Sequence, residues 1–183
     1  MQSIFAISGS TRKNSSNWKI LKFIQENFKN QLNIEIYENL DQLPHFDPNL
    51  KEGEAFPPNV KSFFEKIQNA DGVLICTPEY VFSPPAILKT ALEWTVSETI
   101  LSFKPLALIV ASGMGEKTYD SLGLILKTLL QEEIPETSKL LIQGARGKFR
   151  GDGNFLDPET AKEVLDLMKS LMNKIGENDQ NPN

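Results

Sequence analysis

The sequence predicts an α/β fold in which a parallel sheet is covered by helices on both faces. Three observations predict it: short apolar runs alternate with helical patterns, most of the runs are continuously apolar, and five such runs occur in 183 residues. A strand that is covered on both faces needs apolar side chains on both, so continuous runs are typical of a parallel sheet. The regular alternation of strands and helices along the chain indicates the same class.

The five predicted strands differ in pattern. The second alternates apolar and polar residues, as does a strand with one exposed face, whereas the others are continuously apolar, the last of them more weakly. In chain order they are residues 4–7, 33–38, 73–76, 106–111 and 140–142.

Helices are predicted between these strands, because apolar residues recur there at helical spacing. A segment with helical character begins at Trp18, after the first strand. Helix starts are indicated by Pro84-Pro85 before residues 86–94 and by Asp157-Pro158 before the last helix. The three clearest apolar stripes are Val60, Phe63, Phe64 and Ile67; Tyr119, Leu122, Ile125, Leu126 and Leu129; and Ala161, Val164, Leu165, Met168, Leu171, Met172 and Ile175.

Five parallel strands favour the order 2-1-3-4-5, which is the order of the flavodoxin-like three-layer sandwich. This order places the second strand at an edge, where its alternating pattern fits. Residues 1–176 are expected to form one domain. The polar residues 177–183 are expected to form a flexible C-terminal tail.

Composition narrows the classes of partner. The net charge is −5 and the pI is about 5.0, which argues against nucleic acid, because phosphate backbones need a basic face. No apolar run reaches the roughly 20 residues of a membrane span, and the N-terminus lacks a secretory signal. Cys76 is the only cysteine, which suits a reducing, cytoplasmic setting. No cluster of histidine, cysteine and carboxylate residues has the spacing of a metal site.

Ligands of an open α/β sheet bind beyond the carboxyl ends of its strands, near the point where the strand order reverses. In the order 2-1-3-4-5 this point lies between the first and third strands. The loops after Ile7, Cys76 and Ala111 are therefore the candidate ligand-binding loops.

The first of these loops reads SGSTRKNSSN, residues 8–17, and leads into a predicted helix. The start of a helix favours an anion through its free N–H groups and its dipole. Hydroxyl groups and the Arg12 guanidinium could bind phosphate oxygens, and Asn17 could cap the helix. The stretch matches neither G-x-G-x-x-G nor G-x-x-x-x-G-K-[ST], so a monophosphate fits better than a triphosphate. The alternative is an ordinary polar connection. The hydroxyl residues are Ser10, Thr11, Ser15 and Ser16.

The other two loops could supply a place for a flat ring. Residues 77–85, TPEYVFSPP, combine two aromatic residues with three prolines in a stiff, partly apolar loop. Residues 112–118, SGMGEKT, contain Gly113 and Gly115, which let the backbone approach a ligand closely. Each loop could also be a plain connection. Together, however, the three loops could hold a phosphate and a ring, which favours flavin mononucleotide (FMN) as the ligand.

Two motifs resemble those of the NADPH-dependent FMN reductases, a family of flavodoxin-like fold that includes quinone, azo-dye and chromate reductases. Residues 9–17, GSTRKNSSN, match the family pattern G-S-x-R-x-x-S-x-N in full. Residues 78–94, PEYVFSPPAILKTALEW, follow the pattern P-E-Y-N-x-S-x-P-G-x-L-K-N-A-L-[DE]-W with three departures. Val81 and Thr90 replace asparagines, and Ala86 replaces a glycine. The resemblance extends over nearly the whole chain.

The resemblance implies roles for these residues. The first loop would hold the FMN phosphate, the second would line the flavin edge and ribityl chain, and the third would contact the isoalloxazine. Val81 replaces an amide that could hydrogen-bond the cofactor. The expected cofactor-binding residues are Ser10, Arg12, Ser15, Ser16 and Asn17; Pro78, Glu79, Tyr80, Val81, Phe82 and Ser83; and Ser112, Gly113, Met114 and Gly115.

No residue pattern indicates a protein catalyst. His45 is the only histidine and is expected on a loop. We therefore expect bound FMN to carry the chemistry, with NADPH or NADH as co-substrate and a quinone, azo compound or free flavin as acceptor, in a ping-pong order. The resemblance also implies a homodimer or homotetramer. Two alternatives stay open: a flavodoxin-like electron carrier, and a non-enzymatic FMN-binding or regulatory protein of the same fold.

Overall fold

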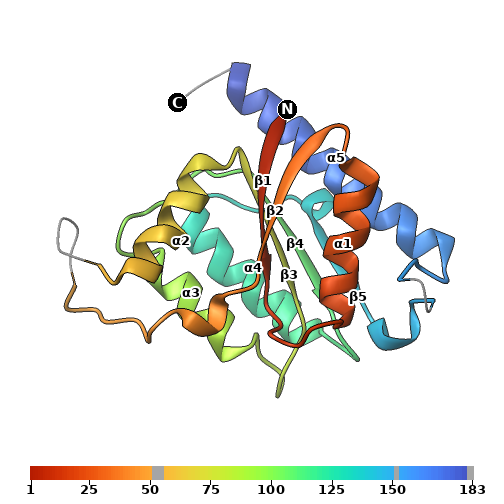
Figure 1. Ribbon diagram of the computed structural model, residues 1–183, viewed down its shortest axis with the longest axis horizontal. Helices are drawn as coiled ribbons and strands as arrows, with labels where there is room; N and C mark the ends of the chain where they lie inside the picture. The colour runs from red at the N-terminus through yellow and green to blue at the C-terminus, as the bar shows by residue number, and fades with distance from the viewer. Residues whose placement is uncertain (51–55, 151–152, 181–183) are drawn as a thin grey trace.

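The strands of the protein form one parallel sheet in the order β2-β1-β3-β4-β5 (Figure 1), which confirms the predicted order. The computed structural model describes residues 1–50, 56–150 and 153–180. The strands are β1 (Gln2–Ser8), β2 (Leu32–Tyr37), β3 (Gly72–Thr77), β4 (Leu106–Ala111) and β5 (Lys139–Ile142).

Burial of the strands follows their sequence patterns. Every residue of β3 and β4 is buried, as their continuously apolar sequences predict for central strands. In β2 the exposed residues Asn33 and Glu35 alternate with the buried residues Leu32 and Ile34, which fits its place at the edge. In the register of the central strands, Ile7 lies opposite Ile75, and Ile75 lies opposite Leu108. All parallel strands therefore present their carboxyl ends at one rim.

Helices cover both faces of the sheet, which gives the predicted three layers (Figure 1). One face carries α1 (Ser16–Phe28) and α5 (Pro158–Gln180). The other face carries α2 (Pro58–Asn69), α3 (Ala86–Trp94) and α4 (Glu116–Leu130). The remaining short helical turns are η1 (Leu40–Gln42), η2 (Glu136–Ser138) and η3 (Ala145–Gly147).

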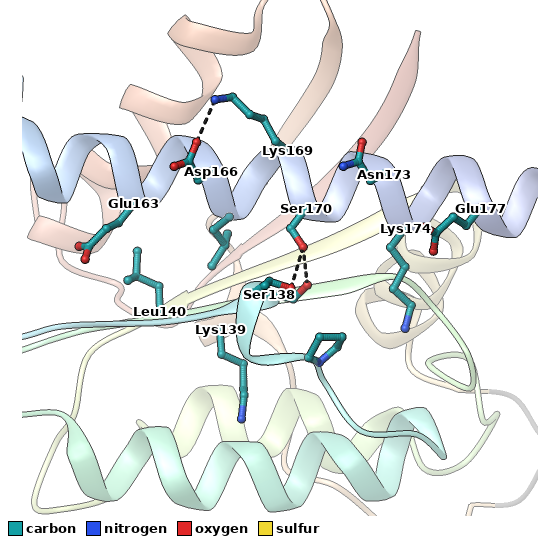
Figure 2. A pocket seen from close by; sticks show the side chains of 13 residues that line it. Ser138, Lys139, Leu140, Glu163, Asp166, Lys169, Ser170, Asn173, Lys174 and Glu177 are labelled. Atoms are coloured by element: carbon teal, nitrogen blue, oxygen red, sulfur yellow. Dashed lines mark hydrogen bonds and ion pairs between the residues drawn. The ribbon is translucent and has the colours of Figure 1, made fainter.

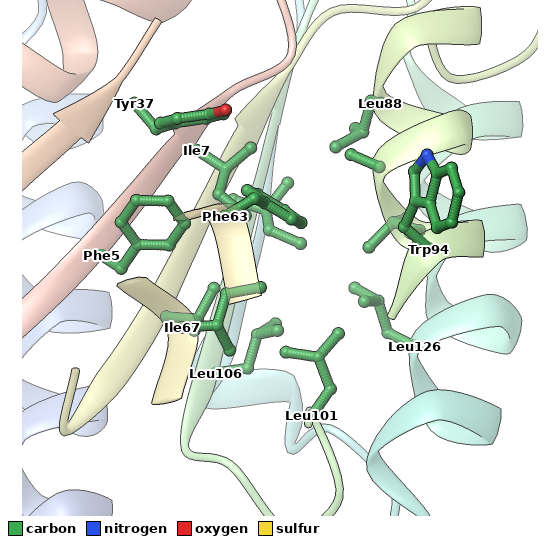
Figure 3. Close-up of a cluster of buried hydrophobic side chains, with 14 of the residues drawn as sticks. Phe5, Ile7, Tyr37, Phe63, Ile67, Leu88, Trp94, Leu101, Leu106 and Leu126 are labelled. Atoms are coloured by element: carbon green, nitrogen blue, oxygen red, sulfur yellow. The ribbon is translucent and has the colours of Figure 1, made fainter. Parts of the chain in front are cut away.

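The core on the α2–α3–α4 face is rich in aromatic side chains (Figure 3). The Phe5 ring lies 5.3 Å from the Tyr37 ring and 5.8 Å from the Phe63 ring, measured between centroids. Trp94 is 1% exposed, and its Nε1–H donates to the Pro44 carbonyl at 2.8 Å. Its indole therefore joins α3 to the segment after β2 and is part of the core.

Both predicted proline-marked helix starts are confirmed, since α3 begins at Ala86 and α5 at Pro158. The Asp157 carboxylate accepts the backbone N–H groups of Glu159 and Thr160, at 3.1 and 3.4 Å, and so caps α5. The hydrogen bond from the Thr160 hydroxyl, at 2.6 Å, and then these backbone hydrogen bonds lower the pKa of Asp157 to about 2.

The end of α5 differs from the prediction of a tail from residue 177. The helix continues to Gln180, so residues 177–180 are helical, and residues 181–183 lie outside the described residues. A polar sequence without an apolar stripe is a weak guide to a helix end, because an existing helix propagates more easily than it starts. None of the described helices is long and apolar enough to cross a lipid bilayer.

Candidate functional site

A cavity of about 420 Å³ opens at the rim formed by the carboxyl ends of the strands. Its walls come from the β1–α1 loop, the β3–α3 loop, the end of β4 and the loop after β5. The predicted residues that line it are Ser10, Arg12, Ser15, Ser16, Asn17, Pro78, Glu79, Tyr80, Ser112 and Gly113. The predicted residues that do not line it are Val81, Phe82, Ser83, Met114 and Gly115.

The β1–α1 loop is held close to β3. The Gly9 N–H donates to the Cys76 carbonyl at 2.9 Å, and the absence of a side chain at Gly9 lets its backbone approach Thr77. Beyond Gly9, the Ser8 hydroxyl donates to the Ser10 carbonyl at 3.0 Å, and the Arg12 N–H donates to the Ser10 hydroxyl at 3.3 Å. Serine side chains thus stabilise the loop through hydrogen bonds with its own backbone.

The cap of α1 is Ser15, not Asn17 as the sequence had indicated. The Ser15 hydroxyl accepts the Trp18 N–H at 3.1 Å, and α1 begins at Ser16. A serine three residues before its donor has the geometry of an N-cap, whereas Asn17 already lies inside the first turn. The polar side chains around this helix start still border the cavity, so the start of α1 faces it.

The Asn17 side chain joins α1 to the sheet. It is 3% exposed, its Nδ2 donates to the Ala111 carbonyl at 3.1 Å, and its Oδ1 accepts the Cys76 thiol at 3.3 Å. Burial raises the pKa of Cys76 well above its ordinary value, so this thiol stays protonated and behaves as a small buried side chain, as its place in an apolar strand predicts. Asn17 therefore fixes the start of α1 above β3 and β4.

Glu79 ties the second loop to the third. Its carboxylate accepts the N–H groups of Gly115 at 3.2 Å and Thr118 at 2.9 Å, at the start of α4. The Ser112 hydroxyl donates to the Glu79 carbonyl at 3.4 Å. Gly115 has a φ of 96°, which glycine adopts without strain. The resemblance had implied that Glu79 lines the flavin edge, and the structure adds an anchoring role for its carboxylate.

Residues 80–83 form a tight two-residue turn. Tyr80 and Ser83 exchange backbone hydrogen bonds of 2.9 and 3.1 Å, and Val81 and Phe82 between them have φ values of 52° and 58°. Left-handed backbone is unfavourable for a β-branched residue, whereas asparagine tolerates it. The asparagine of the family pattern therefore suits the backbone here. Val81 is 94% exposed and is not part of the cavity lining.

Val81→Asn is expected to raise the free energy of unfolding by about 1 kcal/mol, because it relieves the left-handed strain. Urea denaturation of the two proteins measures the change. The matched control is Leu156→Asn, which alters an exposed apolar residue whose φ is not positive. Equal effects of the two substitutions would show that the turn at Val81 is not strained.

Sequence reasoning missed the fourth wall of the cavity. Ala111 at the end of β4 and Gly144, Ala145 and Arg146 after β5 also line it. The sequence contained a signal, because Gly144 lies two residues after the predicted strand 140–142 and the carboxyl end of β5 meets the same rim. The loop was not predicted, because the reversal of strand order singles out the loops near the first and third strands and β5 lies at the far edge of the sheet.

A larger hollow of about 680 Å³ lies between β5, η2 and α5 (Figure 2), away from this rim. Lysines of its lining form ion pairs, among them Lys169 with Asp166 of the same lining at 2.9 Å and Lys174 with Glu132 outside it at 2.5 Å. These ion pairs occupy the Lys169 and Lys174 ammonium groups, and the lining includes neither of the two sequence motifs, so this hollow is not the predicted site. Among the described residues, no group of three or more histidine, cysteine, aspartate or glutamate side chains could hold a metal ion.

The 2-1-3-4-5 sheet with a polar cavity at its carboxyl rim defines a protein of the flavodoxin-like class. Within that class, the chain belongs to the NADPH-dependent FMN reductase family, whose model matches residues 2–129. It is accordingly an oxidoreductase, and FMN as cofactor with NAD(P)H as co-substrate fits the family. The resemblance drawn from the two motifs is confirmed.

Named relatives agree with this assignment. The chain is 30% identical over 172 residues to the NADH:(hydroxy)cinnamate reductase subunit CrdA of Vibrio ruber. This match covers 91% of this chain and 84% of CrdA. The chain is also 32% identical over 172 residues to the NADH-dependent flavin reductase subunit 2 of Lactobacillus johnsonii, covering 88% and 90% of the two chains.

A solved structure supports the fold. The flavoenzyme FerB, an NAD(P)H:(acceptor) oxidoreductase from Paracoccus denitrificans, superimposes with a TM-score of 0.78 at 24% identity, over 97% of this chain and 98% of FerB. The likeness extends beyond residue 129, where the family model ends, and so includes β5 and α5.

Proposed function

We propose that the protein transfers reducing equivalents from NADPH or NADH through bound FMN to a small-molecule acceptor such as a quinone, an azo compound or free flavin. The single observation that carries the proposal is the 420 Å³ cavity, which brings together the two family motifs and the β4–α4 loop. Bound flavin would supply the hydride and electron chemistry, which protein side chains cannot supply.

The residues at the cavity fit a flavin phosphate. The start of α1 offers backbone N–H groups and a dipole, and Ser10, Ser15 and Ser16 offer hydroxyls. The Arg12 guanidinium has no hydrogen bond or ion pair within the described residues, so it is free to bind an anion. Since the side-chain amide of Asn17 is bound to Ala111, we propose that Asn17 contributes to phosphate binding through its backbone N–H.

The opposite part of the cavity fits a ring. Pro78 is buried, Tyr80 is 53% exposed beside it, and Gly113 adds no side chain that would narrow the opening. Glu79 holds the β4–α4 loop in place against these residues. One opening that serves donor and acceptor in turn gives a ping-pong order, and we propose that order for this protein.

The visible spectrum of the purified protein with added FMN tests this proposal. We expect the absorbance of bound oxidised flavin, its loss on adding NADPH or NADH without oxygen, and its return on adding a quinone. The matched control is the same protein without FMN, which should oxidise no NAD(P)H. An electron carrier would bind FMN but would oxidise NAD(P)H only with a separate reductase, and a protein that takes up no FMN would contradict the proposal outright.

We further propose that the chain works as a homodimer or homotetramer in the cytoplasm. Exposed apolar side chains support the assembly: Val96 and Leu124 are 56% and 68% exposed, and Val96 borders a groove of about 190 Å³ between α3 and α4. The buried free thiol of Cys76 suits a reducing compartment. A monomeric mass in sedimentation velocity at micromolar concentration would contradict the assembly.

A further inference from the structure

The cavity contains a second arginine, Arg146, on the loop between β5 and α5. Like that of Arg12, its guanidinium has no ion pair or hydrogen bond within the described residues. The other charged residue of the lining is Glu79, whose carboxylate is occupied by Gly115 and Thr118. A chain of net charge −5 thus presents two free arginines to one cavity, which favours an anionic ligand with more than one charge.

The backbone next to Arg146 is held by the loop that follows β4. The Ala145 N–H donates to the Ser112 carbonyl at 3.0 Å, and the Gly144 N–H donates to the Gly113 carbonyl at 3.1 Å. Ala145 is 1% exposed and packs in the core on the α1–α5 face. Arg146 therefore projects from an anchored turn, so less conformational freedom is lost when it binds a ligand.

The same turn lies beside the start of α1. Asn17 of α1 donates to the Ala111 carbonyl, and the adjoining residue Ser112 accepts from Ala145, so two consecutive residues of the β4 end join α1 to η3. Further along, the Phe155 ring packs edge-on against Phe23 of α1 at 5.0 Å between centroids. These contacts place Arg146 on the side of the cavity where the helix start favours an anion.

We propose that Arg146 is a second phosphate-binding residue, which acts with Arg12 on the flavin phosphate and makes the site selective for FMN over riboflavin. The inference rests on the proposed flavin-binding function. A phosphate monoester carries nearly two negative charges and three acceptor oxygens at neutral pH, so it can use two arginines. Arg146 lies beyond residue 129, where the family model ends, and is thus a feature of this chain that the two motifs do not include.

Titration of flavin-free protein with FMN and with riboflavin, followed by flavin fluorescence, tests the proposal. We expect Arg146→Gln to raise the Kd for FMN about ten- to a hundredfold, the effect of losing a charge-assisted hydrogen bond, and to leave the Kd for riboflavin unchanged. Arg146→Lys should recover part of the loss, since it keeps the charge but not the fork of donors. Arg12→Ala should show the same selective loss, with a raised Kd for FMN and an unchanged Kd for riboflavin.

The matched control is Arg150→Gln, which removes an exposed arginine from the same segment outside the cavity lining and should change neither Kd. An unchanged Kd for FMN in Arg146→Gln, or equal losses for FMN and riboflavin, would overturn the inference. A raised KM for NADPH but not NADH, with FMN binding unchanged, would overturn it too, by assigning Arg146 to the nucleotide phosphate.

The two proposals fail differently. If the wild-type protein binds FMN and Arg146→Gln binds it equally well, only the role of Arg146 is wrong. If the wild-type protein binds neither flavin, the proposed function and the role of Arg146 are both wrong. Thermal unfolding of the flavin-free proteins separates binding from folding, because Arg146 is exposed and its replacement should leave the midpoint unchanged.

Discussion

Gly9→Ala is expected to lower the free energy of unfolding by about 3 kcal/mol and to weaken FMN binding, because the new methyl group has no space. A Cβ at Gly9 would lie 2.1 Å from Thr77 Oγ1, 2.6 Å from Thr77 Cβ and 3.1 Å from Thr77 Cα. Thr77 is fully buried at the end of β3 and cannot turn away. The loop would have to leave β3, which strains the hydrogen bond from Gly9 to Cys76 and shifts the proposed phosphate-binding residues.

Urea denaturation and FMN titration measure the two effects of Gly9→Ala. The matched control is Gly123→Ala, since Gly123 lies inside α4 and a Cβ there would meet nothing within 4 Å. Alanine is the better helix former, so this control should raise the free energy of unfolding by up to about 1 kcal/mol. The two glycine-to-alanine substitutions would thus change the free energy of unfolding in opposite directions. Unchanged stability of Gly9→Ala would refute the close approach of the loop to β3.

The fold could be predicted because its elements carry local patterns. Four continuously apolar runs and one alternating run predicted the strands, and the alternating run at β2 agreed with the edge position that the expected order assigns to it. Helix ends were less predictable where no proline marked them. Residues 177–180 are polar but helical, since α5 continues past its apolar stripe.

The site could be predicted in part. The loops could be located because ligands bind beyond the carboxyl ends of the strands, and these ends meet at one rim of a parallel sheet whatever the side chains are. It could not indicate which side chains face the cavity, since that depends on backbone turns. Val81 and Phe82 lie at the tip of a turn with positive φ, and Gly115 donates to Glu79 at the start of α4, so none of the three lines the cavity.

The contribution of Arg146 required the structure. A lone arginine after the fifth strand has no distinguishing sequence pattern. Its relation to α1 depends on the Asn17–Ala111 and Ala145–Ser112 hydrogen bonds, which join residues far apart in the chain. Long-range contacts of this kind produce no periodic pattern in the sequence.

Glu79→Ala is expected to lower the free energy of unfolding by about 2–3 kcal/mol, because two N–H groups at the start of α4 lose a charged acceptor. The lost hydrogen bonds are those from Gly115 at 3.2 Å and Thr118 at 2.9 Å. Thr118 is buried, so water cannot readily replace the carboxylate there. The β4–α4 loop would lose its anchor, and we expect weaker binding of both FMN and riboflavin, in contrast to the phosphate-specific effect at Arg146.

Glu79→Gln separates the hydrogen bonds from the side-chain volume. Glutamine has one acceptor oxygen in place of two, so it should retain about half of the stability that alanine loses. The matched control is Glu116→Ala, which removes an exposed carboxylate from the first turn of the same helix and should cost only about 0.5 kcal/mol. If Glu79→Ala and Glu116→Ala were equally destabilising, a general charge effect at α4 would account for both. A larger loss at Glu79 would mean that its carboxylate couples the two loops, and the rigidity of the ring side of the cavity would then depend on it.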